Sequence, residues 1–130
     1  MKFEIQSIDR EQFKVAEHTL NGEIVYLVMP IDIKTKWTQQ NKYLRSTLLD
    51  SNGEVISAGF PKFVNWGENP DNFPVPINLS GCEAVEKMDG SLLSWTINKG
   101  KLIVRTRGTV DARNHTNGSE INDFNKKYIG

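Results

Sequence analysis

The dipeptide Asn21-Gly22 constrains the fold of this chain more than any other feature, because it separates two runs of strand-forming residues. Residues 13–20 and 23–29 on either side contain many β-branched, aromatic and other apolar side chains. A two-residue hairpin turn of type I′ needs a positive φ at both central residues, and Asn followed by Gly adopts this conformation most readily. The pattern therefore predicts an antiparallel hairpin near the amino terminus.

Two more pairs of strand-like runs follow the same plan. Residues 44–49 and 54–58 are joined through an Asp-Ser-Asn-Gly run, whose residue types favour turns. Residues 91–97 and 101–106 turn at an Asn-Lys-Gly run. Three consecutive hairpins predict a chain that is mainly antiparallel β.

The other segments are expected to be connections or short helices. Residues 31–41 form either a short helix or a loop, and residues 65–80 contain three prolines, which favour a connector over a regular element. Residues 120–128 have the pattern of a helix that Ser119 caps. We therefore expect an α+β fold, mainly antiparallel β, in one domain that spans residues 1–130.

Composition narrows the class of protein. Sixteen basic and sixteen acidic residues cancel, so any nucleic-acid binding must come from a local patch. The single cysteine, Cys82, is expected to be a buried or half-buried small side chain without a disulfide or a metal. No stretch has the apolar run of a signal peptide or of a membrane span. We expect no membrane partner and a reducing, cytoplasmic location.

Lys87 is the main candidate for chemistry. Residues 83–87 are expected to be a short strand, whose alternation places Val85 and Lys87 on one face. Gly90 lets a ligand approach the backbone closely or lets the chain adopt a positive φ. Asp89 can orient the lysine or accept a hydrogen bond from a ligand hydroxyl. For the Lys-Met-Asp-Gly motif taken alone, a solvated turn between strands is the favoured interpretation.

Four blocks of sequence together carry a family resemblance. Residues 87–92, Lys-Met-Asp-Gly-Ser-Leu, resemble the first nucleotidyltransferase motif of ATP-dependent ligases and RNA capping enzymes. Residues 60–68 resemble the Lys-Phe-Phe-Asn-rich segment that precedes this motif in RNA ligases. Residues 45–53 resemble the Arg-Gly-bearing strand and hairpin of that family, and residues 105–109 resemble its next motif. The chain is thus similar to ATP-dependent RNA ligases of the phage type, in the covalent nucleotidyltransferase superfamily.

This resemblance implies an activity. Lys87 would attack the α-phosphate of ATP, the adenylyl group would pass to the 5′-phosphate of an RNA end, and a 3′-hydroxyl would close the phosphodiester bond. ATP and Mg²⁺ are the implied cofactors, and RNA ends are the implied partners. The nucleotide-binding residues that the resemblance implies are Arg45, Lys62, Glu86, Asp89, Gly90 and Arg107.

The implied roles are electrostatic. A free lysine has a pKa near ~10.4, and nearby cations and partial burial lower that value. Arg45, Lys62 and Arg107 would supply the cations and would also neutralise the triphosphate. The backbone of Glu86 would face the adenine edge.

Several positions depart from the family pattern. Ser46 stands where the family more often has glycine, and Val64 replaces an aromatic residue. Arg105 and Arg107 stand where lysines are common, which changes hydrogen-bond geometry. Strand alternation places both arginines on the face of Ile103, so both are expected to reach a groove beside the site.

Other conspicuous side chains have open interpretations. Phe63, Trp66 and Trp95 either stack on a base or pack in the core. His18 and His115 have no metal-ligand spacing and are assigned no catalytic role.

The later motifs of the family, an acidic residue and a lysine pair, have no counterpart after Thr109. We therefore expect the amino-terminal part of an adenylylation domain, completed by a further carboxy-terminal segment or by a second chain. The alternative is a non-catalytic module that binds a nucleotide or RNA and retains the front half of the site.

Overall fold

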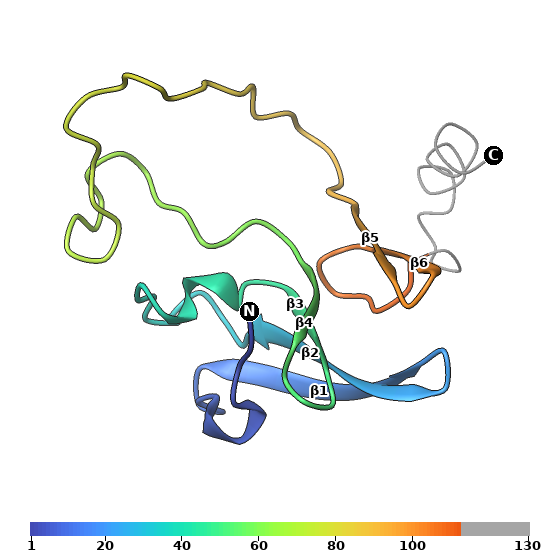
Figure 1. The fold of residues 1–130 in the computed structure, drawn as a ribbon. Helices are drawn as coiled ribbons and strands as arrows, with labels where there is room; N and C mark the ends of the chain where they lie inside the picture. The colour runs from blue at the N-terminus through green and yellow to red at the C-terminus, as the bar shows by residue number, and fades with distance from the viewer. Residues whose placement is uncertain (113–130) are drawn as a thin grey trace.

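The computed structural model describes residues 1–112 as two antiparallel sheets with two short 3-10 turns (Figure 1). The larger sheet has the order β1-β2-β3-β4 and the smaller one pairs β5 with β6. The elements are η1 Ile5–Ser7, β1 Phe13–Leu20, β2 Glu23–Pro30, η2 Asn41–Tyr43, β3 Thr47–Asp50, β4 Val55–Ala58, β5 Ser94–Asn98 and β6 Lys101–Arg105. The prediction of a mainly antiparallel β chain is confirmed.

The helical part of the α+β prediction has little counterpart in residues 1–112, where the only helical elements are the two 3-10 turns. Residues 31–41 are irregular up to η2, so the loop interpretation is the correct one. The helix predicted over 120–128 lies outside the described residues.

Local turn chemistry explains the hairpins. Asn21 and Gly22 have φ values of 51° and 80°, and Leu20 pairs with Glu23 across them. In the β5–β6 hairpin, Lys99 and Gly100 have φ values of 51° and 75°. Positive φ at both central residues matches the right-handed twist of the two strands. All three predicted hairpins are present, although β3 and β5 begin three residues later than predicted.

The core lies on both faces of the larger sheet. Neighbouring side chains of β2 alternate between the faces, so Val28 and Val25 belong to different clusters. Val28 packs in one cluster with residues from the amino-terminal segment, and Val25 packs in the other with Leu48 and Val110. Because both faces are covered, the central strands β2 and β3 contain nearly continuous apolar runs.

The amino terminus is held against the β3–β4 hairpin. The Phe3 amide donates to the Gly53 carbonyl at 2.8 Å, and the Val55 amide donates to the Met1 carbonyl at 3.0 Å. Gly53 has a φ of 86°, and a Cβ atom there would lie 1.9 Å from the Phe3 carbonyl oxygen. Only glycine fits this close approach.

Residues 59–93, here called the arch, leave β4 and return to β5 without a strand or a helix (Figure 1). The proline-rich connector predicted over 65–80 is confirmed. The strand predicted over 83–87 is wrong, because no neighbouring strand offers backbone partners there and Val85 is 80% exposed. Cys82 is also exposed rather than buried. Among residues 1–112, no helix has the length and apolar character to cross a membrane.

Candidate functional site

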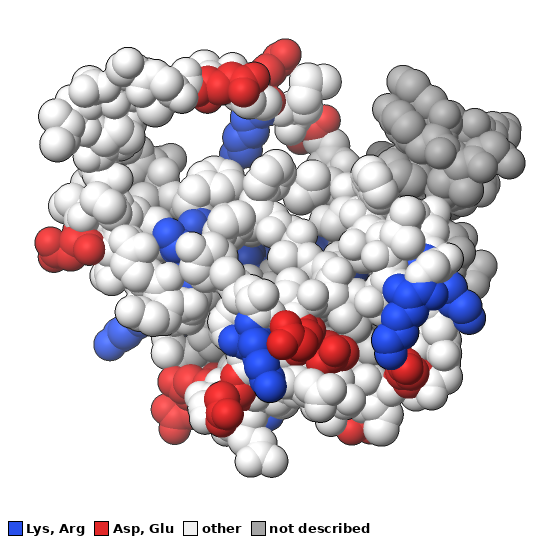
Figure 2. Space-filling view, viewed as in Figure 1, with Lys and Arg blue, Asp and Glu red and all other residues white. Residues whose placement is uncertain are grey.

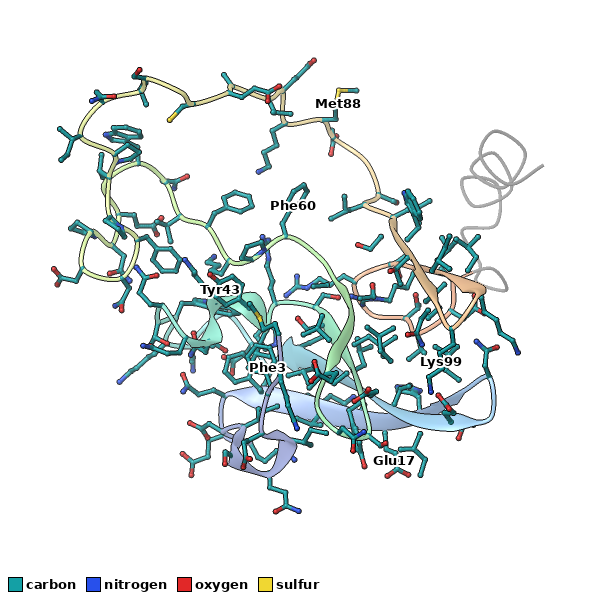
Figure 3. All side chains as sticks on the ribbon, viewed as in Figure 1. Phe3, Glu17, Tyr43, Phe60, Met88 and Lys99 are labelled. Carbon is teal, nitrogen blue, oxygen red and sulfur yellow. The ribbon has the colours of Figure 1, made fainter. Side chains whose placement is uncertain are left out.

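A groove of about 740 Å³ opens between the arch and the sheets. Figure 2 shows the opening beneath the arch, and Figure 3 shows Phe60 rising from the segment after β4 towards the arch that carries Met88. The lining residues come from the segment just before β3, both ends of the arch, β5 and the turn after β6. They are Arg45, Ser46, Gly59, Phe60, Phe63, residues 85–92, Ser94 and Arg107.

Most of the site residues implied by the family resemblance meet in this groove. Lys87 lines it, and the implied nucleotide-binding residues that line it with Lys87 are Arg45, Glu86, Asp89, Gly90 and Arg107. Lys62 is the exception. It is half-buried beside the groove, and its amide donates to the Lys42 carbonyl at 2.7 Å.

Arg45 enters the groove from the segment just before β3. Its guanidinium lies over the Phe63 ring, 5.2 Å from the ring centroid. A cation over an aromatic face is attracted by the ring quadrupole, so Phe63 orients the guanidinium. Phe63 itself is 54% exposed, so packing in the core is the wrong interpretation for this ring.

Lys87 and its neighbours lie on the carboxy-terminal part of the arch. Residues 81–92 are all exposed, and Gly90 has a φ of 143°. No atom lies within 4 Å of a Cβ built at Gly90, so its backbone conformation, and not a close contact, favours glycine here. Glu86 and Asp89 on either side of Lys87 are the two carboxylates of the groove.

Arg107 lies in the turn that follows β6, because the strand ends at Arg105. Its carbonyl accepts a hydrogen bond from Ser46 Oγ at 2.8 Å. This bond joins two chain segments that are sixty-one positions apart and places Arg107 beside Arg45 at the groove.

Arg105 does not reach the groove, which corrects the prediction that it would line the groove with Arg107. It is fully buried, since its guanidinium donates to Ser46 and Ser57 at the edge of the β3–β4 pair. Burial lowers the pKa of Arg105 to about 10, which leaves it protonated at neutral pH. Alternation placed Arg105 on the same strand face as Ile103, but at this position the guanidinium is enclosed by Ser57 of β4 and by Ser46, just before β3.

Two aromatic residues lie outside the groove lining. Trp66 is 70% exposed and Trp95 is 59% exposed, so neither packs in the core. Phe60 lines the groove, although the sequence reasoning assigned it no role. The available signal was a large aromatic side chain two positions after the predicted strand over residues 54–58 and directly before Pro61, because proline is unfavourable inside a paired strand and marks the end of the pairing.

The donor set of the groove bears on the implied Mg²⁺. Within residues 1–112, no three His, Cys, Asp or Glu side chains gather in a way that could hold a metal ion. The groove has two carboxylates, and Mg²⁺ is commonly bound by one or two carboxylates together with substrate phosphates and water. The two carboxylates would therefore suit a magnesium ion whose remaining ligands were phosphate oxygens and water.

Comparison of the chain with protein-family models, curated proteins and solved structures finds no match.

Proposed function

We propose that this chain forms the lysine-bearing part of the adenylylation site of an ATP-dependent RNA ligase. The observation that carries the proposal is the convergence of Lys87, Arg45 and Arg107 on one groove from three separate segments. A lysine nucleophile with flanking cations is the combination that nucleotidyl transfer to an amine requires.

The first step follows from these side chains. The lone pair of Lys87 Nζ forms a bond to the α-phosphorus of ATP, and the bond from that phosphorus to the pyrophosphate oxygen breaks. The Nζ proton passes to solvent. The Arg45 and Arg107 guanidinium groups neutralise the charge on the phosphates and on the leaving pyrophosphate.

The shape of the groove supports a nucleotide as its ligand. Arg45 and Arg107 form a cationic part on the sheet side, while Phe60 and Phe63 offer exposed rings to a base. Pockets of roughly 300–1,000 Å³ hold small-molecule ligands, and this groove falls in that range. The local cations also provide a basic patch that the neutral net charge of the chain does not supply.

In the second and third steps of the proposed reaction, the adenylyl group moves to an RNA 5′-phosphate and a 3′-hydroxyl displaces AMP. The acidic and basic side chains that these steps need beyond the groove would come from a further segment or from a second chain. Glu86 and Asp89 would be the groove carboxylates available to a magnesium ion bound to ATP, which would supply further positive charge at the phosphates.

The test is incubation of the chain with α-³²P-labelled ATP and magnesium, followed by denaturing gel electrophoresis. We expect a covalent label that is absent in Lys87→Ala and in Lys87→Arg, because the first variant lacks the amine and the second has a guanidinium that stays protonated. Lys101→Ala is the matched control, since Lys101 is an exposed lysine outside the groove lining. A label that persists in Lys87→Ala contradicts the assignment of the nucleophile.

The second candidate is a binding module without catalysis. The exposure of residues 81–92 favours it, because attack by an amine is helped by a site that excludes water, and Lys87 lies on an exposed segment. In that case the chain would retain ATP or 5′-phosphorylated RNA on a filter without a covalent label. If adding a carboxy-terminal fragment restores labelling, the result supports the ligase over the binding module.

A further inference from the structure

Arg105 is a buried charge whose hydrogen bonds go to Ser46, which lines the groove, and to Ser57 of β4. Its Nε donates to Ser57 Oγ at 2.8 Å and its Nη1 donates to Ser46 Oγ at 2.9 Å. Its Nη2 donates to the Ser46 carbonyl at 2.8 Å and to the Ser57 carbonyl at 3.1 Å. These four acceptors are uncharged oxygens on two serines.

The two serines stand differently to the groove. Ser46 lines it beside Arg45, and Ser57 lies two positions before Gly59, which also lines it. The Gly59 amide donates to the Ser46 carbonyl at 3.0 Å, so the β3–β4 pairing extends by one bond towards the groove. Arg105 is hydrogen-bonded to both the β3 and β4 segments at this end of the pair, where the strands stop and the arch begins.

The third segment is joined through the same serine. Ser46 Oγ accepts from Arg105 and donates to the Arg107 carbonyl at 2.8 Å. Arg105 and Arg107 are themselves two positions apart. One guanidinium therefore connects the segments that bear Arg45, Phe60 and Arg107, three of the groove residues.

The chemistry of arginine explains why this side chain suits the position. Its planar fork presents five donors in fixed directions, whereas a lysine ammonium has three donors on a compact charge. An apolar side chain of similar volume would fill the space without desolvating a charge. What arginine adds is a defined geometry between the two strands and the turn after β6.

We propose that Arg105 is a positioning residue, which acts through Ser46 and Ser57 to hold Arg45, Phe60 and Arg107 in place around the groove. It touches no substrate. Its contribution is to the placement of the groove cations, and only the labelling part of the test below rests on the proposed function.

The first measurement is the ATP concentration that gives half-maximal labelling of Lys87. We expect Arg105→Lys and Ser46→Ala to raise it about tenfold, since misplacement of binding groups by about 1 Å has effects of up to ~100-fold. Val28→Ala is the matched control, because Val28 is fully buried among residues that do not line the groove. It should lower the melting temperature without changing the ATP dependence. The proposal would be overturned if Arg105→Lys and Ser46→Ala both kept the wild-type ATP dependence. An equal change in Val28→Ala would also overturn it.

The second measurement needs no activity. Hydrogen exchange of the Gly59 amide reports the bond to the Ser46 carbonyl, which Arg105 also holds. We expect this amide to exchange at least about tenfold faster in Arg105→Lys, while the amides of β1 and β2 keep their wild-type rates. An unchanged Gly59 rate contradicts the positioning role. If the wild-type protein takes no label, alone or with a carboxy-terminal fragment, while Gly59 still exchanges faster in Arg105→Lys, the ligase proposal fails and the positioning role stands.

Discussion

The larger sheet and the arch differ in how their apolar side chains are used. In the sheet, Val28, Leu48 and Leu49 are fully buried and pack in two clusters on opposite faces. In the arch, Ile77 is fully exposed and Val85 is nearly so. The apolar burial that stabilises the fold therefore lies in the sheet, while the lysine proposed to react lies on a segment that contributes little to the core.

The two regions meet at the groove, and each supplies a different part of the site. Arg45 and Arg107 are attached to the packed side, through β3 and through the turn after β6. Lys87 belongs to the arch, whose backbone hydrogen bonds include local ones such as that from the Phe73 amide to the Asn69 carbonyl. A bound triphosphate would connect them, because its charges are drawn to cations from both regions.

The largest expected effect contrasts two apolar deletions. Leu48→Ala should lower the free energy of unfolding by about 3–5 kcal/mol, because it leaves a cavity in the apolar cluster on one face of the sheet. Ile77→Ala, the matched change in the arch, should alter it by less than about 0.5 kcal/mol. Urea denaturation followed by circular dichroism measures both. Equal losses in the two variants would show that the arch contributes to the core after all.

A second contrast compares two glycines with positive φ. Gly53→Ala should cost about 2–3 kcal/mol, because its Cβ would collide with the Phe3 carbonyl and displace the amino-terminal segment. Gly81 has a φ of 76°, but no atom lies within 4 Å of an added Cβ. Gly81→Ala should therefore lower the free energy of unfolding by at most about 1 kcal/mol. Thermal denaturation of both variants decides whether the close contact or the backbone angle dominates.

The third prediction concerns the cations of the groove. Arg45→Ala should raise the ATP concentration for half-maximal labelling about tenfold, which corresponds to ~1.4 kcal/mol of lost binding. Lys62→Ala should change it less than about twofold, because Lys62 does not line the groove. If both substitutions had an equal effect, Lys62 would bind the nucleotide as the family resemblance implies, although it does not line the groove.

The smallest expected effect lies at the surface, where Lys99 of the β5–β6 turn meets Glu23 of β2. The Nζ and Oε1 atoms are 2.7 Å apart, and both side chains are more than half exposed. A double-mutant cycle with Lys99→Ala and Glu23→Ala should give a coupling below about 1 kcal/mol, reduced further by salt. A larger, salt-independent coupling would mean that this pair has a structural role in docking the smaller sheet.

The hairpins were predictable because turn chemistry is local. Asn21 and Gly22 determine the first turn by their own φ preferences, and the flanking alternation determines the register. Even Lys99, which is a less favourable residue for positive φ, turns where the Asn-Lys-Gly run predicted. The grouping of Lys87 with Arg45 and Arg107 followed from motif order, and the groove brings these residues together.

The errors arise where a residue depends on what covers it. A period-two pattern over residues 83–87 resembled a strand, but a strand needs a neighbour to pair with, and the arch has none there. Aromatic residues such as Phe63 and Trp95 are common in cores, yet both are exposed. No local signal distinguishes a ring that a sheet covers from one that faces a groove.

Arg105 and Arg107 show most clearly which properties follow from the sequence and which depend on the tertiary structure. Their sequence determined that both are permanent cations beside a predicted hairpin, two positions apart. Only the tertiary structure decided that Arg105 is buried on Ser46 and Ser57 while Arg107 lines the groove. The physical reason is that φ preferences and alternation act between neighbours in the chain, whereas burial depends on strands some fifty positions away.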